Sequence, residues 1–584
     1  MIPELKGQSL LVYDIETNGL DVLKAECKWF IAYSYKNDKH YCLPYTAMKI
    51  IKKLLKGHNK LIGFNNKEFD NTILTNQHEV DFKYKNIIDM CEISRKRLPT
   101  MGIRVLNYKL RTIADTLKLP GGSKGDIDYK IFQKDEWNDE EIKHIEKYGK
   151  QDIICTKDLF EWFFQQFKPL RGFLSQTDQD KFMDVKASPA SLAYRVMCNL
   201  SGNKCDFPPY GEQKKNRFAV TKNETFEGGH FIEPRDKKVS GNIVSVDITS
   251  AYPHAIMMGN LLSPVEEGWS GGDYFDLKGT YNDKNFGKTE DALKKVFLTR
   301  LKAKREGDKI RSMAYKVVIN SFYGTLGRDC FLTFYNPIAA GDCTKMIRTI
   351  IKKFAKTCEE NGFRVIYGFT DNVVVSIPKE SSKEDLMVMV DAFVKDVKNN
   401  VPFPMDTFGF EVDKEYKFIC IFEKNCYLWV DKNGDVGNTK TLLDKNTPKI
   451  IMDVFNNFMC PKIIKNLDVD FTKEELTGYI KEVLKNNVLL AGKIFNAKSL
   501  SEYKSKSSAQ AQISEAYGEG QHTLIPNLKG VGIGKAQSTK KKIGVRHCSI
   551  NEFKENGLTY EDVDVSQLLK ELERFYKKPK ELKV

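Results

Sequence analysis

Two acidic residues, Asp14 and Glu16, lie two positions apart inside an apolar run near the start of the chain, LLVYDIET. The β-branched and aromatic residues of this run are typical of a β-strand. Side chains alternate between the two faces of a strand, so both carboxylates point to the same face. Burying two like charges side by side is costly unless a cation lies between them. The fold must therefore place this strand beside a cation site or end it at the protein surface.

Around this strand, short apolar runs alternate with helical patterns, which indicates an α/β module. The apolar runs are SLLVYDI, WFIAYSY and KLIGFN, and the helical patterns include AMKIIKKLLKG and DEEIKHIEKYGKQDIICTKDLFEWFFQQF. From about residue 226 to 440, strand-like runs are interrupted by helical patterns near 291–306, 309–324 and 338–360. This is typical of an α+β module with a helical insertion. After about residue 441 the chain is Lys-rich, and we expect it to be helical.

A polar pattern continues through the first module. GFNNKEFDN contains Asn65, Phe69 and Asp70, and IEKYGKQD contains Tyr148 and Asp152. The four-residue spacing places the Tyr148 phenol and the Asp152 carboxylate on one face of a helix. The order D-x-E, N-x-x-x-F-D and Y-x-x-x-D resembles the three exonuclease motifs of the family B DNA polymerases and related proofreading nucleases.

The resemblance implies a 3′→5′ proofreading exonuclease in which four carboxylates hold two Mg²⁺ ions. The expected ligands are Asp14, Glu16, Asp70 and Asp152. Tyr148 is then expected to orient the attacking water, and Asn65 and Phe69 to bind DNA.

The segment SVDITSAYPHAI has Asp247 at the end of a β-branched run, with Ser250 and Tyr252 after it. It resembles motif A of the same family, D-x-x-S-x-Y-P. The resemblance implies that Asp247 and the backbone carbonyl of Ile248 bind two catalytic ions, Mg²⁺ or Mn²⁺. The Tyr252 ring would pack under the sugar of the incoming nucleotide and exclude a 2′-hydroxyl.

The run KVVINSFYGTLG carries Lys316, Asn320 and Tyr323 along one side of a helix. It resembles motif B of the family, K-x-x-x-N-S-x-Y-G, and Arg300 and Lys304 match the basic pair on the partner helix of the fingers. All five residues are expected to bind the nucleotide. The cations would neutralise the triphosphate and the pyrophosphate leaving group.

Motif C departs from the family pattern. The family has Y-x-D-T-D-S at a β-hairpin, whereas VIYGFTDNVVV has Tyr367, Phe369, Thr370, Asp371 and Asn372. Phe369 replaces the first acid. The second acid, Asp371, is the main partner of the motif A aspartate in the family, so the pair needed for two-metal phosphoryl transfer is kept.

Further DNA-binding residues are expected at positions that match the family less closely. Phe226 stands where the family's Y-x-G-G has Tyr, and Gly228 and Gly229 follow it. Tyr427 keeps the tyrosine of the family's K-x-Y, and Thr370 of motif C belongs to the same set.

The resemblance implies a mixed α/β and α+β multidomain fold, with a ribonuclease H-like exonuclease domain ahead of a right-hand polymerase. The exonuclease domain is expected at 1–170, a linker and the first part of the palm with motif A at 171–290, short helical fingers with motif B at 291–326, the rest of the palm with motif C at 327–440, and a basic helical thumb with a C-terminal tail at 441–584. The substrates would be primer-template DNA and dNTPs.

The composition favours a polyanionic partner, because the formal net charge is +14 and the isoelectric point is about 8.9. Thirteen cysteines without a C-x-x-C pair argue against a zinc site and a disulfide framework. No apolar run approaches the roughly 18 residues of a membrane helix, and the N-terminus has no signal-peptide pattern. We expect a soluble monomer in the cytoplasm or nucleoid of a host cell, with no membrane partner.

Two alternatives stay open at this point. An exonuclease whose polymerase half is only a DNA-binding scaffold would be consistent with Phe369 and Asn372. A protein-primed polymerase would need a terminal protein, and GDIDYK at 125–130 is similar to the compact phage enzymes of that group. The protein-primed group of the family carries an insertion between motifs A and B. The short stretch between Asp247 and Lys316 lacks it and so resembles instead a nucleic-acid-primed enzyme of a phage, virus or mobile element, with a processivity factor as an optional partner.

Overall fold

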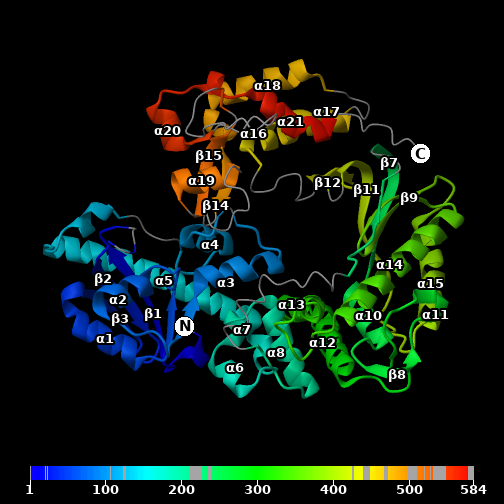
Figure 1. Ribbon diagram of the computed structural model, residues 1–584, viewed down its shortest axis with the longest axis horizontal. Coiled ribbons are helices and arrows are strands. Elements are labelled where there is room, and N and C mark those ends of the chain that lie inside the picture. The colour runs from blue at the N-terminus through cyan, green and yellow to red at the C-terminus, as the bar shows by residue number, and fades with distance from the viewer. Residues whose placement is uncertain are drawn as a thin grey trace. The chain divides into compact units, whose positions relative to one another are not determined.

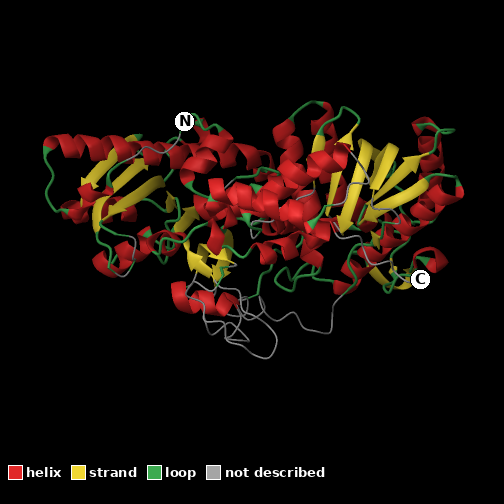
Figure 2. Ribbon diagram, turned by 90° about the horizontal axis from the view of Figure 1, so that it is seen from above, coloured by secondary structure: helices red, strands yellow, loops and turns green. Residues whose placement is uncertain are grey.

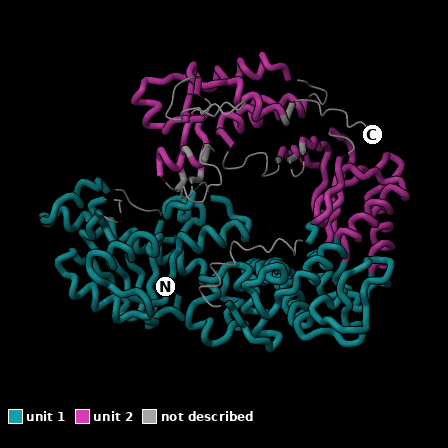
Figure 3. The backbone as a smooth tube through the Cα atoms, in the orientation of Figure 1, with its two compact units in different colours: residues 1–228, 250–347, 398–408 teal, residues 229–249, 348–397, 409–584 magenta. Residues whose placement is uncertain are grey.

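The computed structural model describes residues 2–19, 22, 24–105, 107–122, 127–208, 226–234, 238–423, 426–438, 447–465, 471–497, 509–518, 520–526, 528–529 and 547–576. The chain divides into two compact units, which Figure 3 distinguishes by colour. The first consists of Met1–Gly228, Ser250–Ile347 and Lys398–Phe408, and the second of Gly229–Thr249, Arg348–Val397 and Gly409–Val584.

A five-stranded sheet with the order β3-β2-β1-β4-β5 begins the first unit (Figure 1). Its strands are β1 (Leu10–Thr17), β2 (Cys27–Ser34), β3 (Lys39–Pro44), β4 (Lys60–Gly63) and β5 (Asn86–Asp89). Strand β1 pairs antiparallel with β2 and parallel with β4. Leu11, Tyr13 and Ile15 point to one face and pack against α1 (Met48–Gly57) and α2 (Asp70–His78). Asp14 and Glu16 alternate with them and point to the other face, where helix α5 (Asp139–Arg171) contacts β1 and β2.

Helices make up most of the remainder of the first unit. They are α3 (Met90–Arg97), α4 (Leu110–Leu117), α6 (Gln176–Asp180), α7 (Met183–Lys186), α8 (Pro189–Ser201), α10 (Ala251–Gly259), α11 (Gly272–Phe275), α12 (Lys288–Arg305) and α13 (Lys309–Leu326), with a short strand β8 (Pro264–Trp269). Helices α12 and α13 pack against each other, and α13 also contacts α5 and α8. The helical patterns near 291–306, 309–324 and 338–360 are confirmed as α12, α13 and α14 (Pro337–Glu360).

The second unit contains a seven-stranded sheet with the order β13-β12-β11-β7-β10-β9-β6. Its strands are β6 (Phe231–Ile232), β7 (Lys238–Ile248), β9 (Arg364–Phe369), β10 (Asn372–Ile377), β11 (Phe410–Glu423), β12 (Cys426–Asp431) and β13 (Val436–Asn438). On one face, Phe410 packs against Phe354 of α14 and Phe393 of α15 (Lys383–Asn399). The other face carries an aromatic and aliphatic cluster that includes Ile243, Tyr367 and Val374. Figure 2 shows the strands of both larger sheets in yellow, with helices in red beside them.

The end of the chain, expected to be helical, also contains a three-stranded antiparallel sheet that the sequence analysis did not predict. Its strands are β14 (Lys493–Ala497), β15 (Gly520–Pro526) and β16 (His547–Ser549). The helices are α16 (Lys449–Asp453), α17 (Cys460–Lys465), α18 (Lys473–Asn486), α19 (Ala509–Tyr517), α20 (Ile550–Glu555) and α21 (Val565–Tyr576). Several of them bury a shared core with Phe418 and Cys420 of β11. Among the helices of the described residues, none combines the length and apolarity needed to cross a membrane.

Candidate active sites

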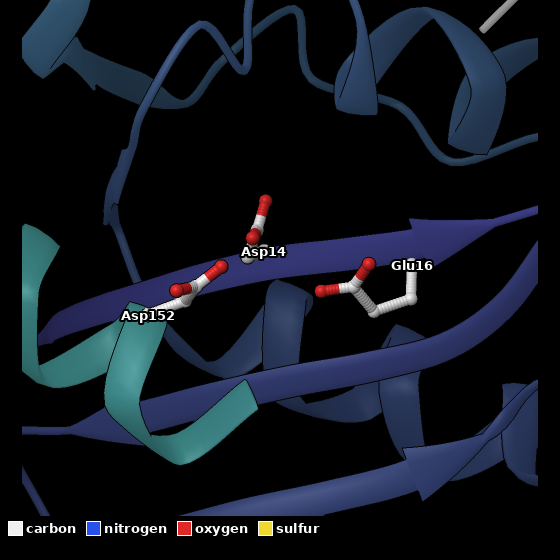
Figure 4. Close-up of side chains that lie close together, drawn as sticks. All are labelled: Asp14, Glu16 and Asp152. Atoms are coloured by element: carbon white, nitrogen blue, oxygen red, sulfur yellow. The ribbon is translucent and has the colours of Figure 1, made fainter. Parts of the chain in front are cut away.

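Three carboxylates converge in the first unit. Asp14 and Glu16 extend from β1 and Asp152 from α5, and Figure 4 shows the three side chains gathered between strand and helix. One carboxylate oxygen from each lies within 4.8 Å of the others. Glu16 and Asp152 are buried, with 6% and 1% of their surfaces exposed. Such a group of oxygen ligands suits a hard divalent cation, which would offset the repulsion between buried like charges.

Gly149 allows helix α5 to lie this close to the sheet. A Cβ atom at Gly149 would come 2.6 Å from the Cγ1 atom of Ile31 on β2. A glycine one turn before Asp152 therefore lets the helix backbone approach β2. The helix begins at a capping box in which Asn138 and Glu141 bond to each other's backbone N–H groups, which stabilises its first turn.

A fourth carboxylate, on Asp70, lies next to this group. Asp70 begins helix α2, is 2% exposed, and accepts a 3.0 Å hydrogen bond from the backbone N–H of Ile15. Burial and the neighbouring Asp14 carboxylate raise the pKa of Asp70 well above its usual range. The structure thus places all four carboxylates that were expected as exonuclease ligands beside one another.

A cavity of about 530 Å³ borders these acids directly. Asn65 and Phe69 line it together with Asp14, Glu16 and Asp70. Asn65 has a left-handed backbone (φ 62°), and its N–H donates to Asp89 Oδ1 at 3.0 Å.

Tyr148 is buried on α5, and its hydroxyl lies 3.1 Å from the hydroxyl of Tyr129. Tyr129 and Gln133 also line the cavity, although neither was predicted from the sequence as a site residue. Both lie on a short 3-10 helix, Tyr129–Gln133, immediately after GDID. The similarity noted for GDIDYK was the one signal that could have drawn attention to Tyr129.

A second acidic group lies at one end of the seven-stranded sheet. Asp247 is near the end of β7 and pairs in register with Asn372 of β10. Asp371 lies in the tight turn between β9 and β10, and its backbone carbonyl accepts a 2.8 Å hydrogen bond from the N–H of Ile248. Thr370, the other turn residue, has a positive φ of 60°. The hairpin thus brings the motif C acid next to the strand that carries the motif A acid.

The surroundings of Asp247 are strongly acidic. Burial, and then the nearby carboxylates of Asp371, Asp413 and Glu411, raise the pKa of Asp247 to about 7. Burial also raises the pKa of Asp371. Glu411 pairs with Asp247 across β11 and β7, so their side chains share one face of the sheet. Glu411 and Asp413 were not predicted from the sequence, although E-V-D repeats the strand spacing of Asp14 and Glu16.

Phe369 occupies the place of the missing motif C acid. It pairs with Asn372 on β10, so its ring points to the same face as Asp247. The ring packs against the cluster that contains Tyr367 and Tyr427. An apolar ring is stable here because this part of the face is aromatic rather than polar.

The residues expected to bind the nucleotide lie on α10, α12 and α13 of the first unit. Tyr252 and Tyr323 stack with ring centroids 4.4 Å apart and an interplanar angle of 14°. Arg300 Nη1 donates to Ser250 Oγ at 3.2 Å. Lys304, Lys316 and Asn320 are solvent-exposed on α12 and α13.

The residues expected to bind DNA lie in both units. In the first, the Phe226 side chain lies next to Gly327 and Gly341, where a Cβ atom would come 3.2 Å from its ring and 3.1 Å from its own Cβ atom, and Gly228 is exposed. In the second, a Cβ atom at Gly229 would lie 2.7 Å from Thr370 Oγ1, so this glycine packs directly against the motif C turn. Tyr427 is partly buried beside Tyr367, with ring centroids 5.6 Å apart.

Comparison with known proteins matches two parts of the chain to family models. Residues 11–164 match the RNase H superfamily, and residues 293–525 match DNA polymerase family B. The DNA polymerase 1 of Saccharolobus solfataricus is 28% identical over 324 residues, which cover 49% of this chain and 34% of that protein. The DNA polymerase of Archaeoglobus fulgidus is 25% identical over 477 residues, which cover 74% of this chain and 56% of that protein. The chain thus spans between a third and just over half of these relatives.

The fold is similar to that of a solved structure, the family B DNA polymerase from the hyperthermophilic archaeon Pyrobaculum calidifontis. The match has a TM-score of 0.57 and 15% sequence identity, and covers 98% of this chain and 78% of the other. The expected mixed α/β multidomain fold, with an RNase H-like domain ahead of a polymerase fold, is confirmed.

Proposed function

Because the chain belongs to the family B DNA polymerases, we propose that it extends a primer along a DNA template and removes nucleotides from the primer 3′ end. Its substrates are then primer-template DNA and dNTPs. The observation that carries this proposal is the separation of its carboxylates into two groups. Asp14, Glu16 and Asp152 converge in the first unit. In the second unit, Asp247 lies on β7 and Asp371 lies in the turn that leads into the neighbouring strand β10.

Both groups fit hard divalent cations such as Mg²⁺ or Mn²⁺, which prefer carboxylate and carbonyl oxygens. Among the described residues, Asp247 Oδ1 is buried without a hydrogen-bond partner, as suits an atom that binds a cation. The nuclease ligands would be Asp14, Glu16, Asp70 and Asp152, and the polymerase ligands Asp247, Asp371 and the Ile248 carbonyl, two ions in each case. Bound ions of this kind activate a nucleophile and stabilise the leaving oxygen of a phosphodiester.

In the nuclease half, the side chains around the acids would hold the primer end. The Tyr148 hydroxyl would orient the attacking water, and its contact with Tyr129 would fix the phenol. Asn65 and Phe69 border the cavity, where an amide can bond to a nucleotide and a ring can stack on a base.

In the polymerase half, the Tyr252 ring would lie under the sugar, held by its stack on Tyr323. Arg300, Lys304 and Lys316 would neutralise the triphosphate, with Asn320 beside them on α13. Primer and template would contact Phe226, Gly228, Gly229, Thr370 and Tyr427.

We assign the exonuclease domain to 1–170, the linker and first part of the palm to 171–290, the fingers to 291–326, the rest of the palm to 327–440, and the thumb and tail to 441–584. The test of the whole proposal is to assay primer extension and primer degradation together, with and without dNTPs, in Mg²⁺ and in Mn²⁺. Extension with dNTPs and degradation without them would support it, and the absence of both in either metal would refute it.

Phe369 favours one second candidate, an exonuclease whose polymerase half binds DNA without extending it. The aromatic ring takes the place of an acid on the face that carries Asp247. The same assay separates the candidates, because degradation without any extension of a matched primer would support the scaffold.

Tyr252→Ala is expected to raise ribonucleotide incorporation by about tenfold or more, because removing the ring opens space for the 2′-hydroxyl. The measurement is the ratio of kcat/KM for dNTP and for the matching rNTP. Tyr252→Phe keeps the ring and serves as the control, so an equal ratio in the Ala and Phe variants would refute the gate.

Gly149→Ala is expected to slow primer degradation by about tenfold or more, because the new methyl group would push α5 and its Asp152 carboxylate away from β1 and β2. Primer extension should stay near the parent rate. Adding Ile31→Ala removes the side chain that the methyl group would meet, so the double variant should regain degradation. A single variant as active as the parent would show that α5 tolerates a side chain here.

A further inference from the structure

His254 is completely buried two residues after Tyr252, and the proposed function gives it no role. Its Nδ1 lies 3.2 Å from the backbone oxygen of Ser250, and its Nε2 lies 2.9 Å from Thr407 Oγ1. A carbonyl oxygen can only accept, so Nδ1 must carry a proton and donate to Ser250. In the neutral ring, Nε2 then accepts from the Thr407 hydroxyl. Both nitrogens are thus held in fixed roles.

Ser250, the residue to which His254 donates, has an unusual backbone. Its φ of 49° and ψ of 59° lie in the left-handed region, which a non-glycine residue adopts only when its surroundings hold it there. Ser250 is also the N-cap residue of α10, the helix that carries Tyr252. Its carbonyl oxygen accepts from the His254 backbone N–H at 3.2 Å in addition to the ring.

The same serine connects to the fingers helices. Ser250 Oγ accepts a hydrogen bond from Arg300 Nη1 of α12. The conformation of Ser250 therefore determines both where α10 begins and where Arg300 is held. The His254 ring also packs against Phe297 of α12, edge to face with centroids 4.9 Å apart, and against Phe408 at 5.7 Å. The imidazole is therefore fixed by α12 and by the segment that contains Thr407 and Phe408.

We infer that His254 is a positioning residue for the nucleotide site, acting through Ser250. By holding the Ser250 carbonyl, it keeps the left-handed turn before α10, which orients the Tyr252 ring for the sugar and leaves Ser250 Oγ in place for Arg300. His254 itself is buried and does not touch the nucleotide. The inference rests on the proposed polymerase function.

The test compares two amides that imitate different nitrogens of the ring. His254→Asn places an N–H donor near Nδ1 and can keep the bond to Ser250, whereas His254→Gln reaches the position of Nε2 and keeps only the Thr407 side. Single-nucleotide incorporation gives KM and kcat for dNTP, and kcat/KM for the matching rNTP. The Gln variant should raise the KM for dNTP about tenfold or more and lose sugar discrimination, with kcat changed much less. The Asn variant, and Thr407→Val as a control, should stay within about threefold of the parent.

Primer degradation and the melting temperature show whether each variant is folded. If the Gln variant fails to fold, the Asn variant decides, because parent-like KM and sugar discrimination support the inference and their loss in a folded Asn variant overturns it. A folded Gln variant with the same KM for dNTP and the same sugar discrimination as the parent would also overturn the inference. If the parent chain extends no primer, the proposed function is refuted. The inference about His254 is then tested by dNTP binding, measured by fluorescence. Weaker binding by the Gln variant than by the Asn variant would support it, and equal binding would overturn it.

Discussion

Replacing Asp14 and Glu16 together by alanine is expected to abolish primer degradation and leave primer extension near the parent rate. The substitution removes two of the three carboxylates that lie within 4.8 Å of one another. Asp70 and Asp152 alone offer too few oxygens to hold two hard cations. Losing several kcal/mol of charge stabilisation corresponds to about a thousandfold or more in rate.

Extension should persist because both acids belong to the five-stranded sheet, whereas Asp247 lies on the seven-stranded sheet of the other unit and Asp371 in a turn of that sheet. The measurement is degradation of a labelled primer without dNTPs, followed by extension of the same primer with them. A matched control, Glu68→Ala with Glu146→Ala, removes the same charge from exposed positions of the same region. Degradation at the parent rate by the Asp14 and Glu16 variant would show that the nuclease site lies elsewhere.

The sequence was sufficient for the acids of the first site because strand and helix spacings are local. Asp14 and Glu16 are two residues apart on a strand, so their side chains point to one face. The order of the motifs then identified Asp70 and Asp152 as their partners. The approach of α5 to β2 was not predictable, because it depends on Gly149 meeting Ile31 across the fold.

The contact between the Tyr129 and Tyr148 hydroxyls could not be predicted from the local sequence pattern either. Tyr129 lies on a 3-10 helix of five residues, too short to leave a periodic signal, and its exposed ring looks like an ordinary surface residue in the sequence. Its role depends on a partner hydroxyl that only the folded chain brings within 3.1 Å.

At the site of Asp247 and Asp371, long-range contacts again could not be predicted from the sequence. The hairpin of β9 and β10 and the positions of Asp247 and Asp371 follow from β-branched runs and the motif order. Strand β11 brings Glu411 beside Asp247 only through long-range pairing, which no local pattern encodes. The strands β14–β16 were missed for a related reason, since short strands with few alternating apolar residues leave little periodicity in a Lys-rich region.

Asp371→Asn is expected to slow primer extension by at least about a hundredfold, equivalent to about 2.7 kcal/mol of transition-state stabilisation. With Phe369 in place of the other motif C acid, Asp371 is the carboxylate that this motif supplies beside Asp247. The amide keeps the shape of the side chain, and the backbone carbonyl of residue 371 can still accept from the Ile248 N–H, so the hairpin should fold as before. The lost negative charge is the main difference.

Degradation of the primer should persist in this variant, because the nuclease acids lie on another sheet. Asp391→Asn, an exposed aspartate on α15, is the matched control and should extend like the parent. Excess Mn²⁺ should recover part of the lost extension if the defect lies in cation binding, since a weakened site fills at higher concentration. Extension by Asp371→Asn at the parent rate would mean that Glu411 and Asp413, which already raise the pKa of Asp247, replace the motif C acid entirely.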